Sequence, residues 1–381
     1  MALAAAVSNI TLEWVEGVDG DRVEERVLPP GDRPKHKSSD AAVRGSWRAH
    51  MNALRRVVEE GLSNALIMED DVDWDLRIKS QLQTFGAASN AWLHMTSDME
   101  SWPSNGLGDD PLITYRPRRS GAESLGITSV MDRESEDRHS IPLDHISPAS
   151  TSPSPDHPYG EGWDVLWLGH CGTDFPDPAS SVPHNLRVVV ADDPTVPAPR
   201  HLKPHPFASH DALGELYPPH TRVVHAASSP GTACTLAYAV SQRGARKLLW
   251  QFGLEDFSSQ WDLMLGDWCA GGYVDRTTPN GDNTDETKSG HDQNDEAAGT
   301  NKNNGLGESS NGNKHGTKGD GERGRRKRQQ PTCMTVQPPI FGHYFAKKGA
   351  SDIRGQGGGY ASKIGAPYVR WSLPDEGEAM W

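Results

Sequence analysis

A short apolar run near the start of the chain ends in a cluster of carboxylates. Residues 65–68 are apolar, and the acids that follow are Glu69, Asp70, Asp71, Asp73 and Asp75. Such a run is typical of a buried strand, and ligands of open α/β sheets bind beyond the carboxyl ends of the strands. Magnesium or manganese, held by one or two carboxylates and bridging a substrate's phosphates, suits such a cluster. The alternative is an acidic turn that faces water.

A helical pattern precedes this strand. Between residues 40 and 61 the apolar residues recur every three or four positions, Asp40 is suited to cap the start, and Gly61 is suited to end the helix. His50 lies on the edge of the apolar stripe. A histidine there can be a packed core residue or can line a cleft.

Further strands and helices follow. Apolar runs predict strands at 165–168, 186–190, 222–225, 232–240 and 333–336. Ser241 is suited to cap a helix, and a later helix carries Asp262. The alternation of helices and strands predicts an α/β fold with a mixed sheet flanked by helices.

Composition indicates that part of the chain is not packed. Only 35% of the 381 residues are hydrophobic, and the chain has 39 glycines and 28 prolines. We expect one domain over 1–354, with disordered inserts at about 101–160 and 275–330 and an irregular tail at 355–381. The net charge of −14 argues against affinity for nucleic acid, and no run approaches the length of a transmembrane helix.

The cysteines suggest disulfides rather than a metal site. The four cysteines form no CxxC pair, which argues against zinc. We expect bridges from Cys171 to Cys234 and from Cys269 to Cys333, because the second would bracket the second insert. Four reduced, buried thiols are the alternative.

These pieces together resemble one enzyme family. The residues that carry the resemblance are the helix from Gly45 to Leu54, Ala65-Leu-Ile-Met-Glu-Asp-Asp-Val72, Asp164-Val-Leu-Trp-Leu-Gly169, Ala237-Tyr-Ala-Val-Ser-Gln-Arg-Gly-Ala-Arg-Lys-Leu-Leu249, Asp262, Pro338-Pro-Ile-Phe341 and Ser351-Asp-Ile353. They resemble glycosyltransferase family 25, which includes lipooligosaccharide and procollagen galactosyltransferases, and are most similar to its fungal members. The similarity spans roughly 1–100, 162–275 and 331–354.

The resemblance implies a GT-A fold and transfer of a hexose, usually galactose, from a UDP-sugar to a glycan or glycoprotein acceptor with inversion. It implies Mn²⁺ or Mg²⁺ as cofactor, with Asp71 as first ligand and Asp73 as a lesser candidate. Glu69 and Asp70 belong to the donor-binding motif, and Glu69 would act through the donor's ribose or a water. A location in the secretory pathway or Golgi follows from the family alone.

The resemblance also suggests roles for three other residues. Asp262 stands where the family carries an acid and would be the general base; the alternative is an ordinary first-turn aspartate. His343 would complete the metal shell, or it is a packed or solvent-facing histidine. His50 matches a histidine of the family's Gly-Cys-x-x-Ser-His pattern, although Ser46 and Ala49 depart from that pattern.

The start of the chain departs further from the family. Its members open with a strand and an Asn-Leu-x-x-Arg-x-x-Arg segment that helps bind the nucleotide, and this chain begins after that point. Two alternatives to an active glycosyltransferase stay open. One is a non-catalytic, glycosyltransferase-like binding protein or a truncated inactive product. The other is a metal-dependent phosphoesterase, for which His170 is the obvious additional ligand.

Overall fold

The computed structural model describes residues 1–29, 40–100, 140–152, 154–177, 185–202, 211–227, 232–273 and 330–343. All of them belong to one compact unit, Met1–Tyr273 with Gln330–Trp381. A second unit, Val274–Gln329, lies outside the described residues, as do the predicted tail and the Ser351-to-Ile353 motif.

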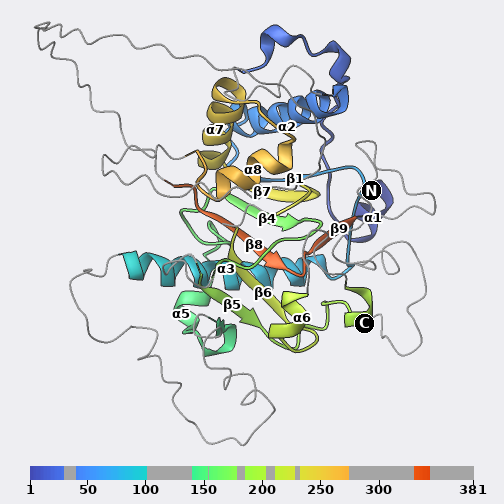
Figure 1. The fold of residues 1–381 in the computed structure, drawn as a ribbon. Coiled ribbons are helices and arrows are strands. Elements are labelled where there is room, and N and C mark those ends of the chain that lie inside the picture. Colours follow the sequence, from blue (N-terminus) through green and yellow to red (C-terminus); the bar gives the residue numbers. More distant parts are fainter. Residues whose placement is uncertain are drawn as a thin grey trace, which may run out of the picture. The chain divides into compact units, whose positions relative to one another are not determined.

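The described residues form an α/β fold around a mixed sheet (Figure 1). The sheet order is β1-β7-β4-β8-β6-β5-β3, and β9 pairs with both β2 and β4. The strands are β1 Asn64–Met68, β2 Val72–Trp74, β3 Ser140–Pro142, β4 Val165–Gly169, β5 Arg187–Val190, β6 Arg222–Ala226, β7 Ala237–Ser241, β8 Cys333–Gln337 and β9 Phe341–His343. The helices are α1 Ala2–Val7, α2 Ala41–Glu59, α3 Ile78–Glu100, α5 Pro148–Thr151, α6 Ala212–Leu216, α7 Gln242–Trp250 with a π-helical turn Gln251–Glu255 (η7), and α8 Trp261–Cys269. This confirms the predicted α/β class and mixed sheet.

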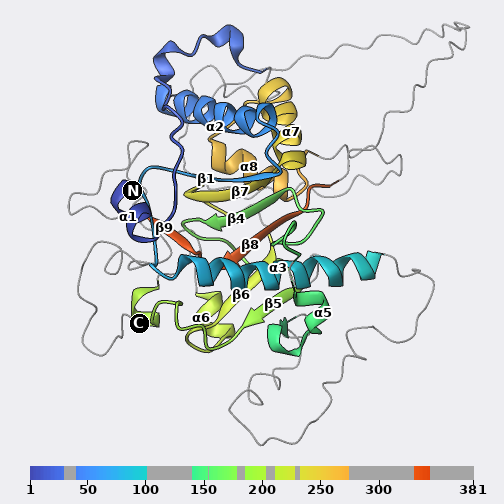
Figure 2. The same cartoon turned by 180° about the vertical axis from the view of Figure 1, so that it is seen from behind.

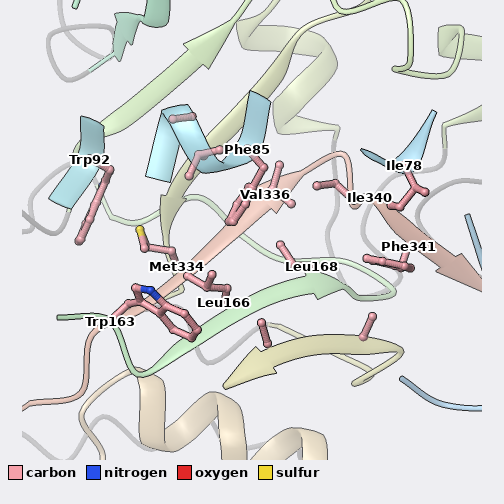
Figure 3. Packing of buried hydrophobic residues seen from close by; sticks show 14 of the residues in the cluster. Ile78, Phe85, Trp92, Trp163, Leu166, Leu168, Met334, Val336, Ile340 and Phe341 are labelled. Atoms are coloured by element: carbon pink, nitrogen blue, oxygen red, sulfur yellow. The ribbon is translucent and has the colours of Figure 1, made fainter. Parts of the chain in front are cut away.

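Alternating side chains of the strands divide the core into two layers. In β4, Leu166 and Leu168 point to the layer with α3, whereas Val165 and Trp167 point to the layer with α2, α7 and α8. Figure 2 shows α3 running past β8, β6 and β5. Figure 3 shows Phe85 and Trp92 of α3 on the same side of the sheet as Met334 and Val336 of β8.

Local capping signals fix the starts of α2 and α7. The carboxylate of Asp40 accepts the N–H of Ala42 at 3.2 Å, and the hydroxyl of Ser241 accepts the N–H of Gly244 at 3.0 Å. Helix α2 packs Trp47, Met51 and Leu54 into the core, as its apolar period predicts. Both helices therefore form where the sequence predicts them.

Strand β1 forms where the sequence predicts it, but the expectation that it is buried was wrong. It pairs with β7 alone, and no other described strand covers its second edge. Leu66 in its middle is 37% exposed. An apolar run of this length occurs both in central, buried strands and in edge strands that are partly exposed. The run therefore predicted a strand but not the position of that strand in the sheet.

The first predicted insert is partly ordered. Residues 101–139 lie outside the described part, but β3, a 3₁₀ turn at Leu143–His145 and α5 fall within 140–160. Strand β3 pairs in parallel with β5, and Ile146 is buried in the layer with α3. The prediction of disorder to residue 160 was wrong because three apolar residues (Ile141, Leu143 and Ile146) suffice to anchor this segment. The second insert lies outside the described residues.

Both expected disulfides are present. Cys171 bonds to Cys234, and Cys269 bonds to Cys333. The first bridge joins the loop after β4 to the segment before β7. The second joins the end of α8 to the start of β8.

Candidate functional site

The acid cluster lies where β1 ends and the chain turns into β2. The last β1–β7 pair is Met68 with Ala237, and the N–H of Glu69 then donates to the carbonyl of Leu236 at 2.9 Å. After the turn, β2 pairs antiparallel with β9, with Val72 opposite His343. The ladder thus brings His343 to the acids.

Glu69 is the most interconnected acid of the cluster. Its Oε1 accepts the hydroxyl of Thr235 at 2.7 Å and lies 3.8 Å from Nε2 of His50. Burial raises the pKa of Glu69, but His50, Thr235 and the more distant His343 outweigh burial and lower the pKa below its ordinary value. Glu69 is therefore held as an anion.

His50 is oriented from two sides. Its Nδ1 lies 3.0 Å from the hydroxyl of Tyr238, and its ring stacks on Trp261 with centroids 4.9 Å apart. Burial, reinforced by the charge of Glu69, raises the pKa of Tyr238 well above its ordinary value, so the hydroxyl keeps its proton and can donate to Nδ1. Nε2–H of His50 then faces Glu69. This histidine is both buried in the core and part of the cluster.

Asp71 and His343 form the second pair of the cluster. Oδ2 of Asp71 lies 3.2 Å from Nε2 of His343, whereas Oδ1 of Asp71 is buried without a hydrogen-bond partner. Burial raises the pKa of Asp71; the charges of Glu69 and of the exposed Asp70 add to this rise, and His343 opposes it. A cation beside Asp71 would relieve this repulsion.

Asp73 has a different environment. It is fully buried in β2, where Oδ1 accepts the N–H of Trp74 at 3.1 Å. The next acid, Asp75, is also buried and pairs with Arg77 at 2.6 Å. These contacts give Asp75 a structural role at the start of α3. They do not join Asp73 to the Asp71–His343 pair.

Asp262 lies in the first turn of α8, and its carboxylate is held by two backbone donors. Oδ2 accepts the N–H of Cys234 and Oδ1 accepts the N–H of Leu263, each at 2.9 Å. Burial and the charge of Glu69 raise the pKa of Asp262, and the two N–H donors act against this rise. The aspartate is thus a helix first-turn residue and also close enough to Glu69 to be affected by its charge.

The charge balance of the cluster favours a cation. Within the described residues, neither arginine nor lysine pairs with Glu69, Asp70, Asp71 or Asp262; His50 lies beside Glu69 and His343 beside Asp71. Across the part of the chain that the structure describes, however, no group of three or more His, Cys, Asp or Glu side chains is arranged as a metal site. Asp71 and His343 are the pair of side chains in the cluster that could contribute ligands to a cation.

Three contacts of the cluster were missed by sequence reasoning. The hydroxyl of Thr235, the N–H of Cys234 and the hydroxyl of Tyr238 all come from residues in or beside β7. The sequence signal nearest to these contacts was the predicted strand at 232–240, which contains all three residues. His170, in contrast, is fully buried with Nε2 2.9 Å from the carbonyl of Val336. That position gives no support to an additional metal ligand.

Two cavities open away from the acids. Their volumes are about 280 and 370 Å³, and both are lined in part by His157, Gly160 and Glu161. The first also touches Asn64 and Ser241, at the end of the β1–β7 ladder opposite Glu69.

The described helices include none long and apolar enough to cross a bilayer.

Comparisons with protein-family models, with curated proteins and with solved structures find no match to this chain. The resemblance to glycosyltransferase family 25 stays a prediction from the residues.

Proposed function

We propose that this chain is a metal-dependent glycosyltransferase with a GT-A-like fold, which moves a hexose, galactose by the family resemblance, from a UDP-sugar to an acceptor hydroxyl with inversion. The observation that carries the proposal is the cluster at the end of β1. No lysine or arginine of the described residues pairs with the acids there, the Asp71–His343 pair lies beside them, and Asp262 is within electrostatic reach of Glu69.

In the proposed donor site, the acids have different roles. Asp71 and His343 would hold Mn²⁺ or Mg²⁺ together with the donor's diphosphate. The cation, when bound, neutralises the charge that develops on the leaving nucleotide. Glu69, kept anionic by His50 and Thr235, would bind the ribose or a water, and the exposed Asp70 would add negative charge beside the cation.

Asp262 would act as the general base for the acceptor hydroxyl. A base works best when its pKa lies near the working pH, and burial raises the pKa of Asp262 towards that range. Its two backbone donors fix the carboxylate on α8. Inversion requires this base on the face opposite the leaving group.

The test separates binding from turnover. Binding of UDP with MnCl₂ is measured by calorimetry, and release of UDP from UDP-galactose is measured with and without manganese. Asp71→Asn should weaken manganese-dependent UDP binding at least about tenfold, because it removes a charged ligand. Asp262→Asn should keep binding but lower turnover about 10²- to 10⁴-fold.

Asp144→Asn is the matched control, since Asp144 is exposed on the 3₁₀ turn after β3. It should behave as the wild type does. Metal-independent turnover, or an Asp71→Asn protein with unchanged binding, would contradict the proposal.

A non-catalytic binding protein is the second candidate, because across the residues that the structure describes no group of three or more His, Cys, Asp or Glu side chains is arranged to hold a metal ion. This candidate predicts that manganese with UDP leaves the melting temperature unchanged. The proposed enzyme predicts a rise that increases with ligand concentration.

A further inference from the structure

One short segment touches both carboxylates to which the proposed function gives separate roles. We define the linking segment as residues 232–236, which directly precede β7. Within it, the hydroxyl of Thr235 donates to Glu69 at 2.7 Å, and the N–H of Cys234 donates to Asp262 at 2.9 Å. The carbonyl of Leu236 also accepts the N–H of Glu69 at 2.9 Å.

The linking segment is anchored to the loop after β4. Cys234 is bonded to Cys171, and the N–H of Cys171 donates to the carbonyl of Ala233 at 2.8 Å. Next to this bridge, the hydroxyls of Thr173 and Thr232 lie 2.6 Å apart. The disulfide and these hydrogen bonds thus join the linking segment to the loop after β4.

The backbone of Cys234 has an unusual conformation. Its φ is +64°, in the left-handed region that residues other than glycine adopt at a cost. The indole N–H of Trp167 donates to the carbonyl of Cys234 at 3.0 Å and, with the disulfide, holds this conformation. The same conformation directs the N–H of Cys234 to Asp262.

We propose that the linking segment, closed by the Cys171–Cys234 disulfide, positions the donor-side carboxylate of Glu69 and the base carboxylate of Asp262 relative to each other. Thr235 and Cys234 are then positioning residues, and the site requires this cysteine pair in its oxidised form. The inference rests on the proposed function, because it assigns the two carboxylates their roles.

The first test uses Thr235, whose side chain is buried. Thr235→Val keeps the shape and removes the hydroxyl that orients Glu69, so the Kd for UDP with MnCl₂ should rise about tenfold, the equivalent of one hydrogen bond to a charged group. Thr235→Ser restores a hydroxyl and should return the Kd to within about threefold of wild type. Equal Kd values for the valine variant and wild type would overturn the inference.

The second test compares the two disulfides. They close loops of nearly equal length, with sequence separations of 63 and 64 residues, so their removal should lower the unfolding midpoint to a similar extent. Cys171→Ala with Cys234→Ala should raise the Kd for UDP with manganese and also lower kcat by at least about tenfold, because both carboxylates lose their alignment. Cys269→Ala with Cys333→Ala should keep both values within about threefold of wild type.

Other outcomes separate the two proposals. If both double variants lose binding equally, the linking segment has no special role and the inference is wrong. If neither double variant folds, the Thr235 pair decides. If wild-type protein binds UDP with manganese and the Thr235 and cysteine variants all match it, the inference alone fails. If wild-type protein neither binds UDP with manganese nor releases UDP from a UDP-sugar, the proposed function fails and this inference fails with it.

Discussion

Burial determines the protonation state of His225 in β6. Its Nδ1 donates to the carbonyl of Ala226 at 2.9 Å, and its Nε2 lies 3.0 Å from the side-chain amide of Gln337. Burial, with smaller contributions from the charges of Arg187 and His170, lowers the pKa of His225 to about 3. The folded protein therefore keeps a neutral imidazole at a pH where the unfolded chain binds a proton.

This difference predicts acid sensitivity. An unfolded histidine titrates near pH 6.5, so the contribution of His225 to stability is complete above that pH and is lost as the pH falls towards 3. At pH 5 the loss should be about 2 kcal/mol. His225→Gln keeps a donor and an acceptor without a titrating group, and urea unfolding should show that it removes this difference between pH 7 and pH 5.

The control is His157→Gln, because the side chain of His157 is 51% exposed. It should keep the wild-type dependence on pH. A His225→Gln protein that loses as much stability as wild type between pH 7 and pH 5 would contradict the assignment.

At the residue scale, the acid cluster can be recognised from the sequence, and its role in binding stays a prediction. Glu69, Asp70 and Asp71 are consecutive acids after an apolar run, and such a cluster is visible without a structure. The hydroxyl that orients Glu69 comes from Thr235, 166 residues away in sequence, and the N–H that orients Asp262 comes from Cys234, 28 residues away. Neither donor belongs to a local pattern, so the sequence indicated only the predicted strand at 232–240 that contains them.

At the scale of elements, two partly exposed cations paired with a buried aspartate join α7 to the sheet. Asp164 is fully buried before β4 and accepts hydrogen bonds from Arg243 and Lys247 of α7, each at 2.8 Å. It also accepts the N–H of Thr332 at 3.0 Å, just before β8. The start of α7 also packs closely against Asp164, because a Cβ on Gly244 would lie 2.2 Å from the carbonyl oxygen of Asp164.

Asp164→Asn should lower the free energy of unfolding by about 2 kcal/mol, because the buried side chain loses its charge-assisted hydrogen bonds to Arg243 and Lys247. Urea unfolding measures the change. The control is Glu59→Gln, which removes an exposed pair with Arg55 and should cost less than about 1 kcal/mol. Equal losses in the two variants would show that these pairs contribute no more than a surface pair.

Elements were predictable to the extent that they have a period or a cap. Helices α2 and α7 have both, and they begin where Asp40 and Ser241 indicate. Strands β2 and β3 have three residues each, too few for any alternation to be recognised, and they exist because long-range partners pair with them. Strand β2 matters for the site, since its pairing with β9 brings His343 to Asp71.

At the scale of the whole described unit, the sheet is open at β1. Strands at an edge can pair with other chains, and charges on the strand prevent this. Strand β1 has none between Asn64 and Met68. We therefore expect this protein to associate as its concentration rises.

Leu66→Lys places a charge in the middle of the open edge and should reduce this association, measured by light scattering over a concentration series. The control is Leu254→Lys, because Leu254 is more exposed than Leu66, at 59%, but lies on the π-helical turn after α7. Equal effects of the two lysines would show that general surface hydrophobicity, and not the strand edge, drives association.

The open edge of β1 also connects self-association with ligand binding. Any strand that pairs with Ile67 and Met68 would extend to within one residue of Glu69. Association at the edge and binding at the acids would then be thermodynamically coupled, and such coupling is reciprocal. If dimer formation changes the affinity for manganese and nucleotide by some factor, these ligands must change the dimerisation constant by the same factor.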